Sequence, residues 1–245
     1  KTYNQTTDVI GATTAPAAIV VSGTLFNGDV LSGGTFAYTD ANASVGDKTL
    51  TVSGVSVLNG ALGVSANYSI SYSNNTTSTI NKAPITVTGL SVTTKAYDGG
   101  LVATITGTPA IGEGFYAGDT ATITGAPSTG TFASANVGEN ISVDIANTLA
   151  IDNPNYYVSG VAGGLTGTIT PKTVTLSATK TYDGNTQLGA NTVTISTGVG
   201  SETLTYRDAV AYSANVGSGN YISEISLLDG TNGGLASNYQ LPTLD

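Results

Sequence analysis

A short segment, Lys-x-Tyr followed by Asp or Asn, occurs three times in this chain and constrains its fold more than any other feature. The copies lie at residues 1–4, 95–98 and 180–183, and their tyrosines are 94 and 85 positions apart. This spacing is too long for a solenoid repeat and suits a small domain. The sequence therefore predicts three tandem domains, each carrying one copy of the segment.

Three further markers follow the first one in the same order and allow the domain boundaries to be placed. They are a turn aspartate (Asp29, Asp119, Asp208), an Ala-x-Val-Gly segment (residues 43–46, 135–138, 214–217) and an Asn-Tyr pair (Asn67, Asn155, Asn238). We predict repeat domains at residues 1–83, 84–170 and 171–245, called below the first, second and third repeats. The first is expected to lack a leading strand and the third a closing strand, which leaves an open sheet edge in each.

The composition favours an all-β fold. Charged residues make up 9 % of the chain, against roughly 25 % in ordinary soluble domains. Segments such as 49–57 and 67–72 alternate apolar and polar residues with period two, which is typical of half-buried strands. Each repeat offers six or seven short strands, so we predict small antiparallel domains in an elongated rod. An Ig-like β-sandwich is favoured over a β-grasp fold, because no long helical period is present.

The charge and the missing residue types exclude several functions. With a net charge of −9, nucleic acid is not an expected partner, since binding its backbone needs clustered Lys and Arg. No stretch of about 18 apolar residues occurs, so no membrane insertion is expected in this segment. The chain has no His and no Cys to act as base or nucleophile, so we expect neither an enzyme nor a cofactor.

The recurring residues are best interpreted as structural. Asp followed by Gly ends a strand and turns the chain, because Asp bonds downstream backbone and Gly supplies a positive φ. The tyrosine before them is expected to be buried, with its hydroxyl bonded to backbone as in the tyrosine corner of β-sandwiches. The asparagines of the Asn-Tyr pairs are expected to satisfy loop backbone. These markers are Tyr3, Tyr97, Asp98, Gly99, Tyr182, Asp183, Gly184, Asn67, Asn155 and Asn238.

Two alternatives place a ligand on the chain. Tyr156-Tyr157 and Phe115-Tyr116 are candidates for stacking on a sugar, because the chain has no Trp. Calcium would need the dispersed acids Asp98 and Asp183 to meet the turn aspartates in space, since no Asp-x-Asp-x-Asp-Gly loop is present. A Lys–Asn isopeptide bond and glycosylation are left open by the sequence.

The four markers in this order, with the Thr-Ile-Thr-Pro-Lys junction at 168–172, resemble the YDG/MBG-type repeat domains of large bacterial surface adhesins of the filamentous-haemagglutinin type. The resemblance covers essentially the whole chain. It implies an extracellular or bacterial cell-surface location, a stalk or spacer role, and no catalytic residues. The parent adhesin would bind a host-cell or matrix glycan or protein, and we expect this segment to be a monomer. The alternative is a module that itself binds glycan or matrix through loop tyrosines.

Overall fold

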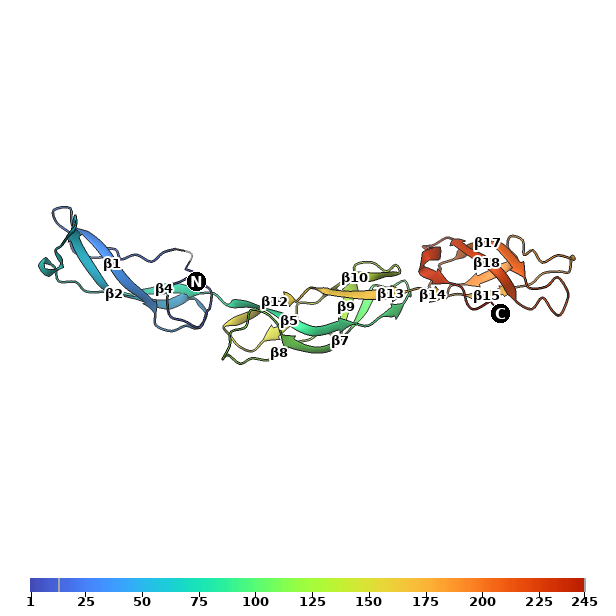
Figure 1. The fold of residues 1–245 in the computed structure, drawn as a ribbon, viewed down its shortest axis with the longest axis horizontal. Coiled ribbons are helices and arrows are strands. Elements are labelled where there is room, and N and C mark those ends of the chain that lie inside the picture. The colour runs from blue at the N-terminus through green and yellow to red at the C-terminus, as the bar shows by residue number, and fades with distance from the viewer. Residues whose placement is uncertain (13, 245) are drawn as a thin grey trace. The chain divides into compact units, whose positions relative to one another are not determined.

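The computed structural model describes residues 1–12 and 14–244, which form an all-β structure (Figure 1). The only helical segments among these residues are two 3₁₀ turns, η1 (Ser65–Asn67) and η2 (Ala236–Asn238). This confirms the all-β prediction. Within the described part of the chain, no helix is long and apolar enough to span a bilayer.

The chain forms two compact units, and the second repeat is divided between them. The first unit comprises Lys1–Gly89, Thr108–Ala126 and Thr148–Ala162, and the second comprises Leu90–Gly107, Pro127–Asn147 and Gly163–Asp245. The predicted boundary at 83/84 therefore lies inside the first unit, and that at 170/171 lies inside the second. Each predicted boundary therefore lies within one compact unit.

One antiparallel sheet forms the framework of the first repeat. Its strands are β1 (Val30–Tyr38), β2 (Ser44–Asn59), β3 (Leu62–Gly63) and β4 (Asn75–Ile80). The long strand β2 pairs with the other three, in a register that runs from Val30↔Leu58 to Tyr38↔Leu50 on the β1 side. Its alternating sequence places Val55 and Val57 in the interior, with 8 % and 1 % of their surface exposed.

A curled sheet of seven strands forms the second repeat, in the order β12-β5-β7-β9-β10-β13-β6. The leading strand β5 is flanked by β12 in parallel and by β7, and its Ile85 and Val87 are fully buried. A small sheet of β8 (Ile123–Thr124) and β11 (Ala150–Ile151) completes the repeat. The seven strands are β5 (Ala83–Val92), β6 (Lys95–Ala96), β7 (Val102–Ile111), β9 (Thr129–Phe132), β10 (Gly138–Ile145), β12 (Tyr156–Val161) and β13 (Leu165–Thr170).

Three two-stranded sheets form the third repeat. Its core contains Leu188, Val193, Ala209, Ile222 and Ile225. The pairs are β14 with β19 in parallel, and β15 with β16 and β17 with β18 antiparallel. The strands are β14 (Lys172–Thr173), β15 (Thr175–Ala178), β16 (Val193–Ser196), β17 (Leu204–Ala211), β18 (Ile222–Asp229) and β19 (Tyr239–Gln240).

Each repeat runs into the next without a linker. The closing strand lies beside the Lys-x-Tyr segment of its own repeat, through the parallel pairs Thr2↔Asn81 and Ala96↔Thr170. The next residues pair with the Asn-Tyr segment of the following repeat, through Ala83↔Tyr156 and Lys172↔Tyr239. One continuous segment thus closes one repeat and opens the next.

The strand register corrects one sequence marker. Ser44 pairs with Ile80 as Gly138 pairs with Ile169, so Ser44 corresponds to Gly138. The counterpart of Asn136 is therefore Asn42, and the Ala-x-Val-Gly assignment at residues 43–46 is wrong by two positions. The letter pattern misled because Ala, Ser, Val and Gly are common throughout this chain, whereas backbone pairing fixes the alignment.

The strand expected at residues 67–72 is also wrong. Residues 68–74 form no strand, and neither do residues 14–25, which include the apolar run 17–21. The physical reason is the absence of a paired neighbour, since strand structure needs a ladder partner. The predicted open edge of the first repeat lies along these two segments.

We predict that Gly114→Ala destabilises the fold more than Gly118→Ala does. Both glycines have a positive φ, 91° and 94°, so both variants carry backbone strain. Only at Gly114 would the added Cβ overlap the carbonyl oxygen of Pro84 in β5, whereas at Gly118 it would meet nothing within 4 Å. Urea unfolding should show about 1–3 kcal/mol more loss for Gly114→Ala. Equal losses would contradict the close approach of the two backbones.

Candidate functional site at the repeat junctions

A shared carboxylate joins the first repeat to the second. The hydroxyls of Tyr3 and Tyr156 both donate to Asp119 Oδ2, at 2.9 and 2.5 Å, and Tyr116 N donates to the Tyr156 hydroxyl at 3.2 Å. The rings of Tyr3 and Tyr156 pack edge to face, with centroids 5.3 Å apart, and both are buried. We call Tyr3, Tyr156, Asp119, Asn155 and Asn42 the first junction.

The boundary between the second and third repeats has the same arrangement. Tyr97 donates to Glu202 Oε1 at 2.8 Å, and Tyr239 donates to Oε2 at 2.7 Å. The two rings are again edge to face, with centroids 5.3 Å apart, and both are buried. We call Tyr97, Tyr239, Glu202, Asn238 and Asn136 the second junction.

An asparagine completes each junction. Asn155 accepts a hydrogen bond from Ala43 N at 2.8 Å and donates to Asn42 Oδ1 at 3.1 Å. Asn238, only 1 % exposed, accepts from Val137 N at 2.9 Å and donates to Asn136 Oδ1 at 3.0 Å. The asparagine of the Asn-Tyr pair therefore binds a loop of the preceding repeat, not a loop of its own repeat.

The first junction combines a charged acceptor with neutral phenols. The hydrogen bond from Tyr156 holds the pKa of Asp119 below its usual value. Burial, followed by the hydrogen bond to the carboxylate, raises the pKa of Tyr3 and of Tyr156. The same two causes raise the pKa of Tyr97 and Tyr239 at the second junction. Hydrogen bonds from a phenol to an ionised carboxylate are stronger than those between neutral groups.

The lysine of each Lys-x-Tyr segment closes its own loop. Lys95 Nζ donates to Asp98 Oδ1 at 2.6 Å and to Gly100 O at 2.7 Å, and Asp98 also accepts from Gly100 N. Lys1 makes the equivalent bond to Asn4 Oδ1 at 2.6 Å. Gly99 has a φ of 74°, which fits the turn role of this glycine. The lysine thus holds the turn that follows the junction tyrosine, a role that the sequence did not reveal.

Two sequence expectations are corrected here. The hydroxyls of Tyr3 and Tyr97 bond to carboxylates of the following repeat and not to local backbone, because each ring points across the boundary. The acid of the third repeat is Glu202 and not Asp208, which lies in β17 with its carboxylate 3.4 Å from Arg207. The order of the markers pointed to Asp208 because the loops of the repeats differ in length, so Glu202 is not at the expected position.

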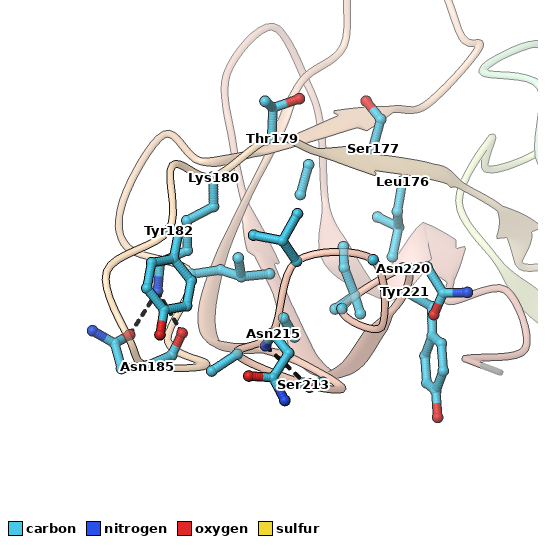
Figure 2. Close-up of a pocket in the computed structure, with 18 of the residues that line it drawn as sticks. Leu176, Ser177, Thr179, Lys180, Tyr182, Asn185, Ser213, Asn215, Asn220 and Tyr221 are labelled. Atoms are coloured by element: carbon cyan, nitrogen blue, oxygen red, sulfur yellow. Dashed lines mark hydrogen bonds between the residues drawn. The ribbon is translucent and has the colours of Figure 1, made fainter.

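The third copy of the segment lies on an open surface (Figure 2). Lys180 closes its loop as in the other copies, donating to Asn185 Oδ1 at 2.6 Å and lying 2.8 Å from Asp183. Tyr182 is 63 % exposed, whereas Tyr3 and Tyr97 are 5 % and 4 % exposed. A cavity of about 630 Å³ adjoins it, lined among others by Asn215, Val216, Ile222 and Leu244.

The candidate sugar-binding aromatics are placed very differently. Tyr156 is 1 % exposed, between Tyr3 and Phe115, so its assignment as a ligand contact is wrong while the junction is intact. Phe115 packs against the same core. Tyr157 and Tyr116 are 48 % and 39 % exposed and keep accessible surface.

The acids and lysines considered for calcium and for an isopeptide bond have other partners. Among the described residues, no three His, Cys, Asp or Glu side chains gather closely enough to hold a metal ion. Asp119 is bonded to tyrosines, as is Asp29, which accepts from the Tyr68 hydroxyl at 2.6 Å. The amine of Lys95 is bonded within its own loop, to Asp98 Oδ1 and Gly100 O.

The fold and its junctions define a tandem-repeat β protein whose consecutive repeats contact one another through tyrosine, carboxylate and asparagine side chains. The YDG domain family matches the chain twice, at residues 81–163 and 166–245. The chain therefore belongs to the YDG domain family, as the Lys-x-Tyr-Asp-Gly segments indicated. Comparison with curated proteins and with solved structures found no match.

We predict that Tyr156→Phe lowers the free energy of unfolding by about 1–3 kcal/mol, because it removes a hydrogen bond to a charged acceptor. The matched control is Tyr157→Phe, one residue along the same strand and half exposed. The control should change stability by less than about 0.5 kcal/mol. Chemical denaturation followed by circular dichroism measures both. Equal effects would show that the Asp119 contact does not stabilise the junction.

The junction tyrosines predict a loss of stability at high pH. Their folded pKa values are raised, so their contribution is complete below the unfolded tyrosine pKa of about 10 and is lost as pH rises above it. Phenolate absorbance should show a group of tyrosines that ionises later in the native chain than in the urea-unfolded chain. Coincident titration curves would contradict the buried hydroxyl–carboxylate bonds.

Proposed function

We propose that the chain is a structural spacer of a secreted or surface-anchored bacterial adhesin. In this proposal the three repeats are Ig-like β domains in tandem that together form an elongated rod. The rod projects a distal region of the parent protein, which binds a host-cell or matrix glycan or protein. The chain itself has no catalytic role, acts as a monomer outside the cell, and binds neither nucleic acid nor membrane.

The observation that carries this proposal is the repetition of one junction at two boundaries. Both junctions use two buried tyrosines, one carboxylate and two asparagines, with similar distances. A flexible linker would need none of these contacts, because Gly- and Ser-rich chains join domains without fixing them. Asp119 and Glu202 differ in length, yet each accepts hydrogen bonds from two tyrosines. The same type of contact at both boundaries suits a stiff spacer.

The acidic residues support a structural role over a catalytic one. Asp119 and Glu202 each bind two tyrosine hydroxyls, and Asp98 binds a lysine and a backbone N–H. Carboxylates that act in glycoside hydrolysis work as a pair flanking the bond that is cleaved. The carboxylates at these positions are instead engaged singly with groups of the protein.

Small-angle X-ray scattering tests the spacer proposal. We expect an elongated particle with little variation in its maximum dimension between low and high salt. The variant Asn238→Ala should add flexibility, because it frees the loop at Val137 that the amide binds. The control is Asn147→Ala, at an exposed loop position outside both junctions. A wild-type chain as flexible as Asn238→Ala would sink the proposal.

The second candidate function is direct adhesion through exposed tyrosines. The exposure of Tyr157 and Tyr116 is the observation that keeps it open. A glycan and host-matrix binding assay on this chain separates the two functions. Binding that disappears in Tyr157→Ala would favour an adhesive module, and no binding by the wild type favours the spacer.

A further inference from the structure

The first repeat contains a large apolar groove. Its volume is about 860 Å³, and its base is formed by side chains of the sheet, including Phe36, Val55 and Val57. Its walls are residues 14–25 and 68–75, two segments without strand structure before Asn75. Ile19 and Tyr72 on these walls are 74 % and 44 % exposed. Exposed apolar side chains gathered along a groove are a feature of interaction sites.

The hydrogen bonds of the first repeat identify what this groove corresponds to. Phe26 N donates to the Tyr68 hydroxyl at 3.0 Å, and Tyr68 donates to Asp29 Oδ2 at 2.6 Å. The same three bonding partners recur in the second repeat as Tyr116, Tyr156 and Asp119. The walls of the groove therefore correspond to β7 with the loop after it, and to β12. In the second repeat, β5 lies between those strands.

The strand β5 shows what chemistry fills such a position. Ile85 and Val87 point into the core and are 1 % and 0 % exposed. Both backbone edges are paired, through Thr86 N to Glu113 O at 3.0 Å and Ala162 N to Val87 O at 2.9 Å. The groove thus calls for an extended segment with β-branched apolar residues at alternate positions.

A second groove lies in the third repeat (Figure 2). Its cavity of about 630 Å³ is lined by residues 180–182 on one side and by residues such as Gly217 and Ile222 on the other. The corresponding elements in the second repeat are β6 and β10, and β13 lies between them, through Ile169↔Lys95 and Ile141↔Gly167. The groove of the third repeat is therefore the position of a closing strand.

We infer that both grooves are strand-acceptor sites and that one extended segment, with the chemistry of residues 75–92, fills both. Its closing half enters the third repeat of one copy of the chain, and its leading half enters the first repeat of another copy. Residues 75–92 already have this topology, since β4 passes directly into β5. Strand addition to a sheet edge is an established mode of peptide recognition. The inference does not depend on the spacer function.

The side chains beside the two grooves are of the same types as those that form the two junctions. Tyr182 and Asn215 adjoin the groove of the third repeat, as Tyr97 and Asn136 adjoin β13 at the second junction. The first repeat supplies the complementary set, Asp29, Asn67 and Tyr68, with the Tyr68–Asp29 bond already formed. A bound segment would bring together a third copy of the junction from two copies of the chain.

The test adds a synthetic peptide of residues 75–92 to the full chain. We expect a higher melting temperature and, by sedimentation, species that contain two or more copies of the chain. A peptide of residues 83–92 alone should raise the melting temperature without assembly, because it fills only the groove of the first repeat. The control peptide exchanges Ile85 with Thr86 and Val87 with Thr88, which turns the apolar face outward. It should bind about a hundredfold more weakly.

A chain variant separates assembly from strand binding. Tyr182→Ala removes an exposed side chain and should reduce assembly by the 75–92 peptide while leaving binding of the 83–92 peptide unchanged. Equal binding of the control peptide, or no thermal shift with either native peptide, would overturn the inference.

Discussion

A tyrosine hydroxyl cannot be buried without a partner, and this constraint organises both repeat boundaries. Two rings from consecutive repeats pack edge to face and place their hydroxyls on one acidic side chain. Asp119 accepts both on one oxygen, and Glu202 uses one oxygen for each. The acid is therefore satisfied only when both repeats are present, so each boundary stabilises the elements on either side of it.

Side-chain packing also makes each repeat depend on its neighbour. The core of the first unit runs across the boundary, since Tyr3 and Ile80 share it with Ile85 and Tyr156. A small β domain buries a limited fraction of its surface, and a core extended into its neighbour offsets part of that deficit. In every copy the lysine closes the loop that follows the tyrosine.

The sequence predicted the all-β class and the YDG domains of residues 81–245. It could not predict that Tyr97 reaches Glu202, because the two lie 105 positions apart in loops of unequal length. It also placed the Ala-x-Val-Gly marker of the first repeat two positions late, at residues 43–46, because patterns of Ala, Ser and Gly recur by chance in this chain. Tyr156 was offered as a ligand contact because an aromatic pair looks the same in sequence whether buried or exposed.

The passage of β4 directly into β5 has a mechanical consequence. A pull on the chain at this boundary acts along the strands and loads their lateral hydrogen bonds in shear, so that many bonds resist together. Because β4 closes one repeat and β5 opens the next, extracting this segment removes one strand from the sheet of each neighbour at once. Rupture at this boundary would then disturb both repeats, since neither can lose its strand alone.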